Sequence, residues 1–284
     1  MPRTVRRRFV DVSTGQAHLR EAGTDGDLPP IVCLHMVPKS GRSFARVLPL
    51  LADGRRVIAP DLPGYGDSDP PADPASVSIA DYAAATWEVI DALALPRPVH
   101  FVGYHTGSMV AVAAASRRPG EVARLVNISA PLFTAGEVAE LHAFFAPLPL
   151  DEAGTRFRIM WERILRFRGP GMTLPMAAAS LADNLRAGED YEEGHRAAFE
   201  HTAAYARELV ALTHPLLVMN INDDLVTHTR RVDALLANGE RRDYPDWGNG
   251  FLELWPEAVA AELLDFLDAD SDPGPAAQSA SATS

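Results

Sequence analysis

The amino-acid sequence predicts an α/β protein with a mostly parallel eight-stranded sheet, helices on both faces and an inserted helical cap. Two observations carry this prediction. Short apolar segments with strand character alternate with amphipathic helical segments at both ends of the chain, and the alternation stops between residues 131 and 212. Alternating strands and helices favour right-handed βαβ crossovers, which place ligands at the carboxyl ends of the strands.

The first 130 residues contain six predicted strands. Residues 8–20 are typical of a hairpin, and Pro29-Pro30 separates it from Ile31–Leu34, an apolar run expected of a strand buried on both faces. The remaining elements follow in chain order: a helix at 43–51, a strand at 56–60, an amphipathic helix at 79–95, a strand near 100–102, a small-residue helix that ends at 118, and a strand at 123–128.

Residues 131–212 are predicted as a helical cap, because this stretch is rich in Ala, Phe and Arg and broken by Pro and Gly. The strand rhythm then resumes, with strands at 216–220 and 241–244 and helices at 229–236 and 256–267. We therefore expect an α/β core formed by residues 1–130 and 213–269. Residues 270–284 are Ser, Ala, Pro, Gly and Asp without apolar periodicity, which predicts a disordered tail.

Composition restricts the class of partner. The chain has 284 residues, with 38 acidic against 26 basic side chains and a net charge of −12, which disfavours binding to nucleic acid or to an anionic membrane. No apolar run approaches the roughly 18 residues of a membrane span, and no signal peptide is expected. The single Cys33 excludes an internal disulfide and a thiolate cluster. These features predict a soluble, cytoplasmic protein that acts on a small molecule, as a monomer or a homodimer.

The segment that organises the rest is Gly103-Tyr104-His105-Thr106-Gly107, which joins an apolar strand to a small-residue helix. Glycines on both sides allow a strand and a helix to pack against a very tight turn. The middle residue of such a turn occupies a strained backbone conformation and projects toward the ligand side of the sheet. That residue is His105.

Four segments in the right order resemble the α/β-hydrolase superfamily, in particular its lidded esterases and epoxide hydrolases, over roughly residues 9–267. The turn at His105 resembles the nucleophile elbow, G-x-S-x-G, with histidine in place of serine. The other segments resemble the oxyanion loop, the D-x-x-G-x-G-x-S loop, and the acid strand with the segment before the last helix; they are 34–38, 61–68, and 215–224 with 246–257.

The resemblance implies a role for each matched position. His105 takes the place of the nucleophile, Asp224 (or else Asp223) that of the acid, and Asn249 that of the base. The backbone N–H groups of Val37 and Thr106 would form the oxyanion hole, with Met36 where the family has glycine. Asparagine cannot accept a proton at neutral pH, so a serine–histidine relay is excluded.

An imidazole beside an oxyanion hole is suited to proton abstraction next to a carbonyl group, because the hole stabilises the enolate. The main functional prediction is therefore a cofactor-free, metal-free enzyme that performs an elimination, isomerisation or cyclisation on a small carbonyl compound, such as a secondary metabolite. Two alternatives stay open. In one, His105 activates water to hydrolyse an ester, lactone or epoxide. In the other, the protein binds a small molecule without catalysis.

The pocket around His105 is expected to be largely apolar and aromatic. Beside the catalytic candidates, five side chains are predicted to line it because they lie in the matched segments or in the cap: His35, Tyr104, Phe133, Trp161 and Trp247. The histidines of the cap and of the C-terminal region show no metal-ligand spacing and receive no role.

Overall fold

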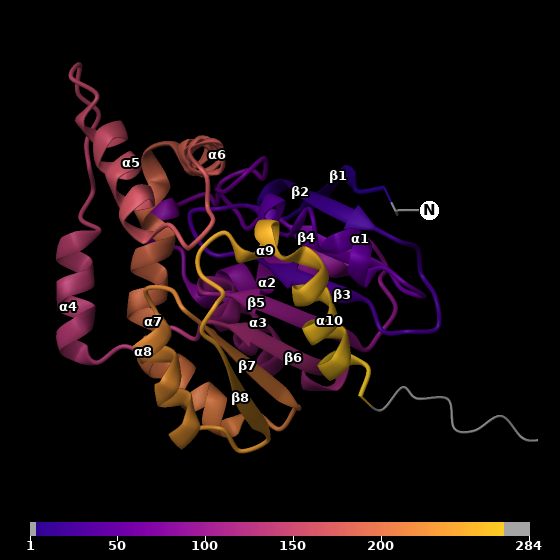
Figure 1. Cartoon of the computed structure of the whole chain (residues 1–284). Coiled ribbons are helices and arrows are strands. Elements are labelled where there is room, and N and C mark those ends of the chain that lie inside the picture. Colours follow the sequence, from indigo (N-terminus) through magenta and orange to yellow (C-terminus); the bar gives the residue numbers. More distant parts are fainter. Residues whose placement is uncertain (1–3, 270–284) are drawn as a thin grey trace, which may run out of the picture.

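A computed structural model describes residues 4–269, and its centre is one eight-stranded sheet (Figure 1). The strand order is β1-β2-β4-β3-β5-β6-β7-β8. Strands β1, β2 and β4 pair antiparallel, and all other neighbours pair parallel, so the predicted α/β class and strand number are confirmed. The strands are β1 Arg6–Val12, β2 Gly15–Ala22, β3 Ile31–Leu34, β4 Val57–Pro60, β5 Val99–Tyr104, β6 Val122–Ile128, β7 Leu216–Ile221 and β8 Gly239–Tyr244.

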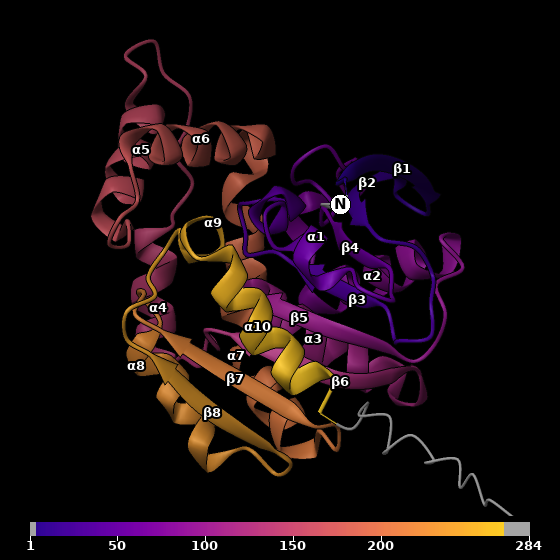
Figure 2. The ribbon, with the colours of Figure 1, turned by 45° about the vertical axis from the view of Figure 1, so that its right-hand side comes forward.

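Helices cover both faces of the sheet, and each face carries its own apolar core (Figures 1 and 2). Helices α2, α3 and α7 pack on one face, while α1 and α10 pack on the other. The core helices are α1 Leu48–Leu51, α2 Ile79–Ala92, α3 Thr106–Arg117, α8 Val226–Thr229, α9 Phe251–Leu254 and α10 Pro256–Leu267, with single 3₁₀ segments η1 Gly41–Phe44, η2 Pro74–Ser76, η3 Pro119–Glu121 and η5 Arg230–Ala234.

Two predicted helices are each replaced by a short α-helix and a 3₁₀ segment. The helix predicted at 43–51 is instead η1 followed by α1, because Pro49 has no N–H to donate and its ring would collide with the carbonyl of Ala45 in a continuous helix. The helix predicted at 229–236 is α8 followed by η5 and begins at Val226.

The segment between β6 and β7, where the sequence predicts the cap, is helical: α4 Ala135–Phe144, α5 Thr155–Phe167, α6 Leu174–Asn184, η4 Leu185–Glu192 and α7 Glu193–Ala211. Helices α4, α5 and α6 lie together on one side of the sheet in both views (Figures 1 and 2). Buried hydrogen bonds join this segment to the core. Ser40 Oγ donates to Asp183 at 2.8 Å, and the N–H of Gly194 donates to Tyr65 Oη at 2.8 Å.

The tail predicted at 270–284 lies outside the described residues. Among residues 4–269, no helix combines the length and the hydropathy that a membrane crossing requires.

Candidate functional site

His105 stands at the turn between β5 and α3, with φ 49° and ψ −116°. Positive φ is strained for a residue with a Cβ, so the surrounding backbone must hold it in place. Two glycines make this possible. A Cβ on Gly103 would lie 2.3 Å from the carbonyl oxygen of Gly107, and one on Gly107 would lie 2.0 Å from the carbonyl oxygen of Leu34. The turn therefore has the geometry of a nucleophile elbow, with histidine at its apex.

The His105 ring is bonded to the carboxylate of Asp223. Nε2 lies 2.9 Å from Asp223 Oδ2, which also accepts a hydrogen bond from Ser129 Oγ at 2.6 Å, and Asp223 Oδ1 accepts one from the N–H of Leu225 at 2.8 Å. A carboxylate that accepts three bonds needs donors, so Nε2 carries the hydrogen. In the neutral ring the lone pair is then on Nδ1, which has no hydrogen-bond partner among residues 4–269.

The hydrogen-bond partner of His105 is therefore Asp223, the second choice of the sequence analysis, and not Asp224, its first choice. Both follow β7, but the side chain of Asp223 is completely buried at the end of the sheet, whereas Asp224 is exposed. Ser129, directly after β6, fixes the Asp223 carboxylate from the neighbouring strand. Asp224 still lines the cavity beside His105 and acts on it through its charge.

The surroundings of His105 make it a stronger base than a free imidazole. Burial is the largest single influence and favours the neutral ring, but the charge of Asp223, its hydrogen bond and the charge of Asp224 together outweigh burial. The pKa of His105 is consequently raised above its ordinary value.

Asn249 lines the cavity, and its side-chain hydrogen bonds go to groups other than His105. Its Oδ1 accepts a hydrogen bond from Tyr104 Oη at 2.9 Å, and its Nδ2 donates to the carbonyl oxygen of Phe167 at 2.9 Å. These bonds tie the loop after β8 to the elbow strand and to the end of α5. Asn249 thus links segments of the site through hydrogen bonds and is not part of a proton relay.

The predicted oxyanion residues lie together. Met36, Val37 and Thr106 all line the same cavity as His105. The N–H of Thr106 belongs to the first turn of α3, where a helix leaves its N–H groups without intrahelical partners. Two backbone donors at this place are suited to a developing negative charge on a substrate oxygen.

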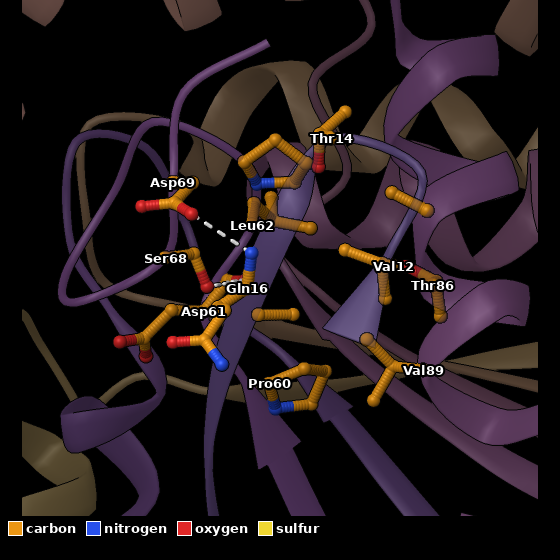
Figure 3. A pocket seen from close by; sticks show the side chains of 13 residues that line it. Val12, Thr14, Gln16, Pro60, Asp61, Leu62, Ser68, Asp69, Thr86 and Val89 are labelled. Carbon is orange, nitrogen blue, oxygen red and sulfur yellow. Dashed lines mark hydrogen bonds between the residues drawn. The ribbon is translucent and has the colours of Figure 1, made fainter. Parts of the chain in front are cut away.

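The cavity has a volume of about 860 Å³ and lies between the elbow and the helices α4 to α7. This volume is typical of a small-molecule site. Another hollow, lined by Gln16, Asp61, Ser68 and Asp69, measures about 10 Å³ (Figure 3). A space of that size holds about one water molecule at most, so it cannot accept a substrate.

Two of the five predicted pocket side chains, Tyr104 and Phe133, line the cavity, and three do not. His35 is fully buried below it: Nδ1–H donates to the carbonyl oxygen of Met36, and Nε2 accepts from the N–H of Leu62, both at 2.9 Å. Trp247 is stacked between Tyr244 and Phe251, and Trp161 lies on α5 outside the lining. Periodicity does not show which face of a cap helix meets the cavity.

Two groups of His and Asp side chains have geometry that could hold a metal ion, His18 with Asp61 and Asp67, and His105 with Asp223 and Asp224. In both groups the bonded carboxylate already has partners within the protein. Asp61 accepts from His18 Nδ1 at 2.8 Å and from the N–H of Gly41 at 2.7 Å. Each group is thus already joined by hydrogen bonds within the protein.

Several cavity side chains were not found from the sequence. Lys39, Arg163, Tyr191 and His195 line the cavity, and Lys39 donates to Ser180 Oγ at 2.5 Å. Burial, then the charge of Arg163, lowers the pKa of His195 to about 3, so this ring is neutral at neutral pH. Sequence reasoning also missed Ser129, which bonds to Asp223 and lies outside the cavity lining. Its signal in the sequence is that it follows a parallel strand next to the elbow strand.

The profile of the family described as "alpha/beta hydrolase fold" matches residues 29–254, most of the chain. The chain belongs to this family. A non-heme chloroperoxidase from Burkholderia pyrrocinia is 30% identical over 277 residues, which cover 86% of this chain and 93% of that protein.

Further similarities are more local or more distant. A pimeloyl-[acyl-carrier protein] methyl ester esterase from Methylococcus capsulatus is 39% identical over 113 residues, and the match spans 39% of this chain and only 41% of that esterase. Among solved structures, Cfl2 from Burkholderia cenocepacia superposes with a TM-score of 0.72 at 26% identity, covering 93% of this chain and 96% of that one.

Proposed function

We propose that this protein is a hydrolase of an ester, lactone or epoxide in which His105 activates water directly. The observation that carries the proposal is the His105–Asp223 pair at the apex of an elbow that faces the large cavity. The family membership and the similarity to an esterase support hydrolysis over elimination, isomerisation or cyclisation.

The proposed step needs one base and one oxyanion site. Nδ1 of His105 removes a proton from water while the water oxygen attacks the carbonyl carbon of the substrate. The N–H groups of Val37 and Thr106 hold the negative oxygen, and the resulting imidazolium returns the proton to the leaving oxygen. Asp223 keeps the ring in the tautomer that exposes Nδ1 and stabilises its charged form. An ester gives an acid and an alcohol, and a lactone gives a hydroxy acid. With an epoxide the water oxygen attacks a ring carbon, the ring oxygen takes up the returned proton, and a diol results.

Direct attack by the imidazole is a less suitable route. It would produce an acyl-imidazole, whose hydrolysis needs a second base. Asn249 cannot be that base, and His195, with its pKa lowered to about 3 by burial and then by Arg163, is a weak one. The single-displacement route uses only groups that the site supplies.

An isotope experiment tests the proposal. Ester, lactone and epoxide panels are incubated with the protein in ¹⁸O-water and, separately, in D₂O, and products are analysed by mass spectrometry. We expect ¹⁸O in the product and no deuterium on carbon. Deuterium next to the carbonyl without ¹⁸O would replace hydrolysis by the enolate chemistry that the sequence first suggested. Tight binding of panel members without turnover would identify a binding protein.

A further inference from the structure

The cavity contains a cation, Arg163, that forms no ion pair with any carboxylate of residues 4–269. Its charge acts on Glu192, but that carboxylate is paired with Arg156 at 3.3 Å. Arg163, on α5, is half-buried and lines the cavity. Its Nη2 donates to the carbonyl oxygen of Phe144, its Nη1 is buried without a hydrogen-bond partner, and no carboxylate of residues 4–269 forms an ion pair with it. A buried N–H group without an acceptor costs free energy, and a ligand oxygen that accepts from it would remove that cost.

Aromatic rings fix the position of this guanidinium group. Its central carbon lies 4.7 Å from the ring centroid of Phe144 and 5.0 Å from that of Phe145. Cation–π contacts of this kind hold the planar group in place while its N–H groups stay available. His195 stacks on Phe145 with ring centroids 4.1 Å apart. Arg163 is therefore held rigidly at a wall of the cavity.

The charge of the cavity differs from that of the whole protein. The chain carries 38 acidic and 26 basic residues, but the cavity lining carries five acidic and six basic ones. Two of the acidic groups already have partners: Glu137 is bonded to Arg231, and Asp183 to Ser40. The exposed part of the lining carries four basic residues against three acidic ones, a small excess of positive charge that favours anions; the basic ones are Arg42, Arg46, Arg166 and Arg168, and the acidic ones are Glu140, Asp224 and Glu253.

We propose that Arg163 binds a carboxylate group of the substrate, so that the protein acts on molecules that carry a carboxylate at one end and the reacting ester, lactone or epoxide at the other. A carboxylate is favoured over a phosphate dianion because the single guanidinium group of Arg163 balances one negative charge. The inference rests on the proposed function only for the reacting group; the anion site stands on its own contacts.

The test uses stable probes. N-methyl monoamides of succinic, glutaric, adipic and suberic acid carry one carboxylate, and the corresponding N,N′-dimethyl diamides are neutral. Isothermal titration with the full-length protein should show at least one monoamide bound about 10- to 100-fold more tightly than its diamide. Arg163→Gln should remove this preference and Arg163→Lys should keep part of it. Arg158→Gln, on the same helix but outside the cavity lining, should leave it unchanged.

Equal binding of monoamide and diamide, no binding of any monoamide, or a preference that survives in a folded Arg163→Gln protein would overturn the proposal. Hydrolysis of the matching monomethyl and dimethyl esters separates it from the proposed function. If monoamides bind through Arg163 but no ester is hydrolysed, the anion site is confirmed and the hydrolase proposal is wrong. If wild type and Arg163→Gln hydrolyse both esters equally well, the hydrolase proposal is supported and the anion site is wrong.

Discussion

Replacing His105 by alanine should lower kcat on a hydrolysed substrate by about 10²–10⁴-fold, the usual contribution of a general base. His105→Gln should be nearly as impaired, because glutamine keeps polarity and approximate size but cannot accept the proton. KM should change much less than kcat, since the cavity and the backbone N–H groups remain. Initial rates and substrate binding, measured on variants with native circular dichroism, give the comparison.

A matched control for His105 is His214→Ala, which removes an imidazole outside the cavity lining and should leave kcat unchanged. If His105→Ala retained the activity of wild type, water activation by this ring would be wrong. If kcat stayed constant while KM rose strongly, His105 would be a binding group and not a base.

Among substitutions that add one methyl group to the elbow, Gly107→Ala should lower the stability of the fold the most. Its Cβ would lie 2.0 Å from the carbonyl oxygen of Leu34 and 3.0 Å from that of His35, and these backbone atoms cannot rotate away. We expect the free energy of unfolding to fall by about 2–4 kcal/mol, as in severe overpacking. Chemical denaturation measures this, and the wild-type value in the variant would contradict the close approach of α3 to β3.

Gly136→Ala is the matched control, because nothing lies within 4 Å of the new methyl group in α4. Alanine has the higher helix propensity, so this variant should be neutral or more stable by less than about 1 kcal/mol. A large loss in both variants would show that the elbow glycine is not special.

The fold was predictable because strands and helices leave local patterns of apolar residues, glycine and proline in the sequence. The predicted bounds are correct for the strand Ile31–Leu34 and the helix Pro256–Leu267. The strand is a fully apolar run whose ends are visible in the sequence, and a proline marks the start of the amphipathic helix. The helix expected at 43–51 failed because Pro49 outweighs apolar periodicity. The apex position of His105 was predictable for a similar reason: adjacent glycines mark a turn that only such residues permit.

The partners of His105 were not predictable to the same degree. Asp223 and Asp224 are adjacent, and the choice between them depends on which side chain turns toward Ser129, a contact between two parallel strands. His35 was misplaced for a related reason, because its two hydrogen bonds to backbone groups exist only in the folded loop. Arg163 was missed because no motif records which face of a cap helix is turned to the cavity.

Nitrogen-15 NMR of labelled histidine shows directly whether His105 is a base whose Nε2 is protonated and bonded to Asp223. Long-range proton–nitrogen correlations through a pH titration give both the tautomer and the pKa. In the neutral state Nδ1 should carry the lone pair, and the pKa should exceed the ordinary value of about 6.5.

The sign of the pH dependence follows from the same measurement. A protonated ring cannot accept a proton, so hydrolysis should fall as the pH drops through the raised pKa of His105. Asp223→Asn removes the main charge that raises this pKa, so the NMR transition and the acid limb of kcat should both move to lower pH. Two results would contradict the proposed role of His105. One is a lone pair on Nε2 in the neutral ring. The other is a His105 pKa that lies at or below the ordinary value and does not change in Asp223→Asn.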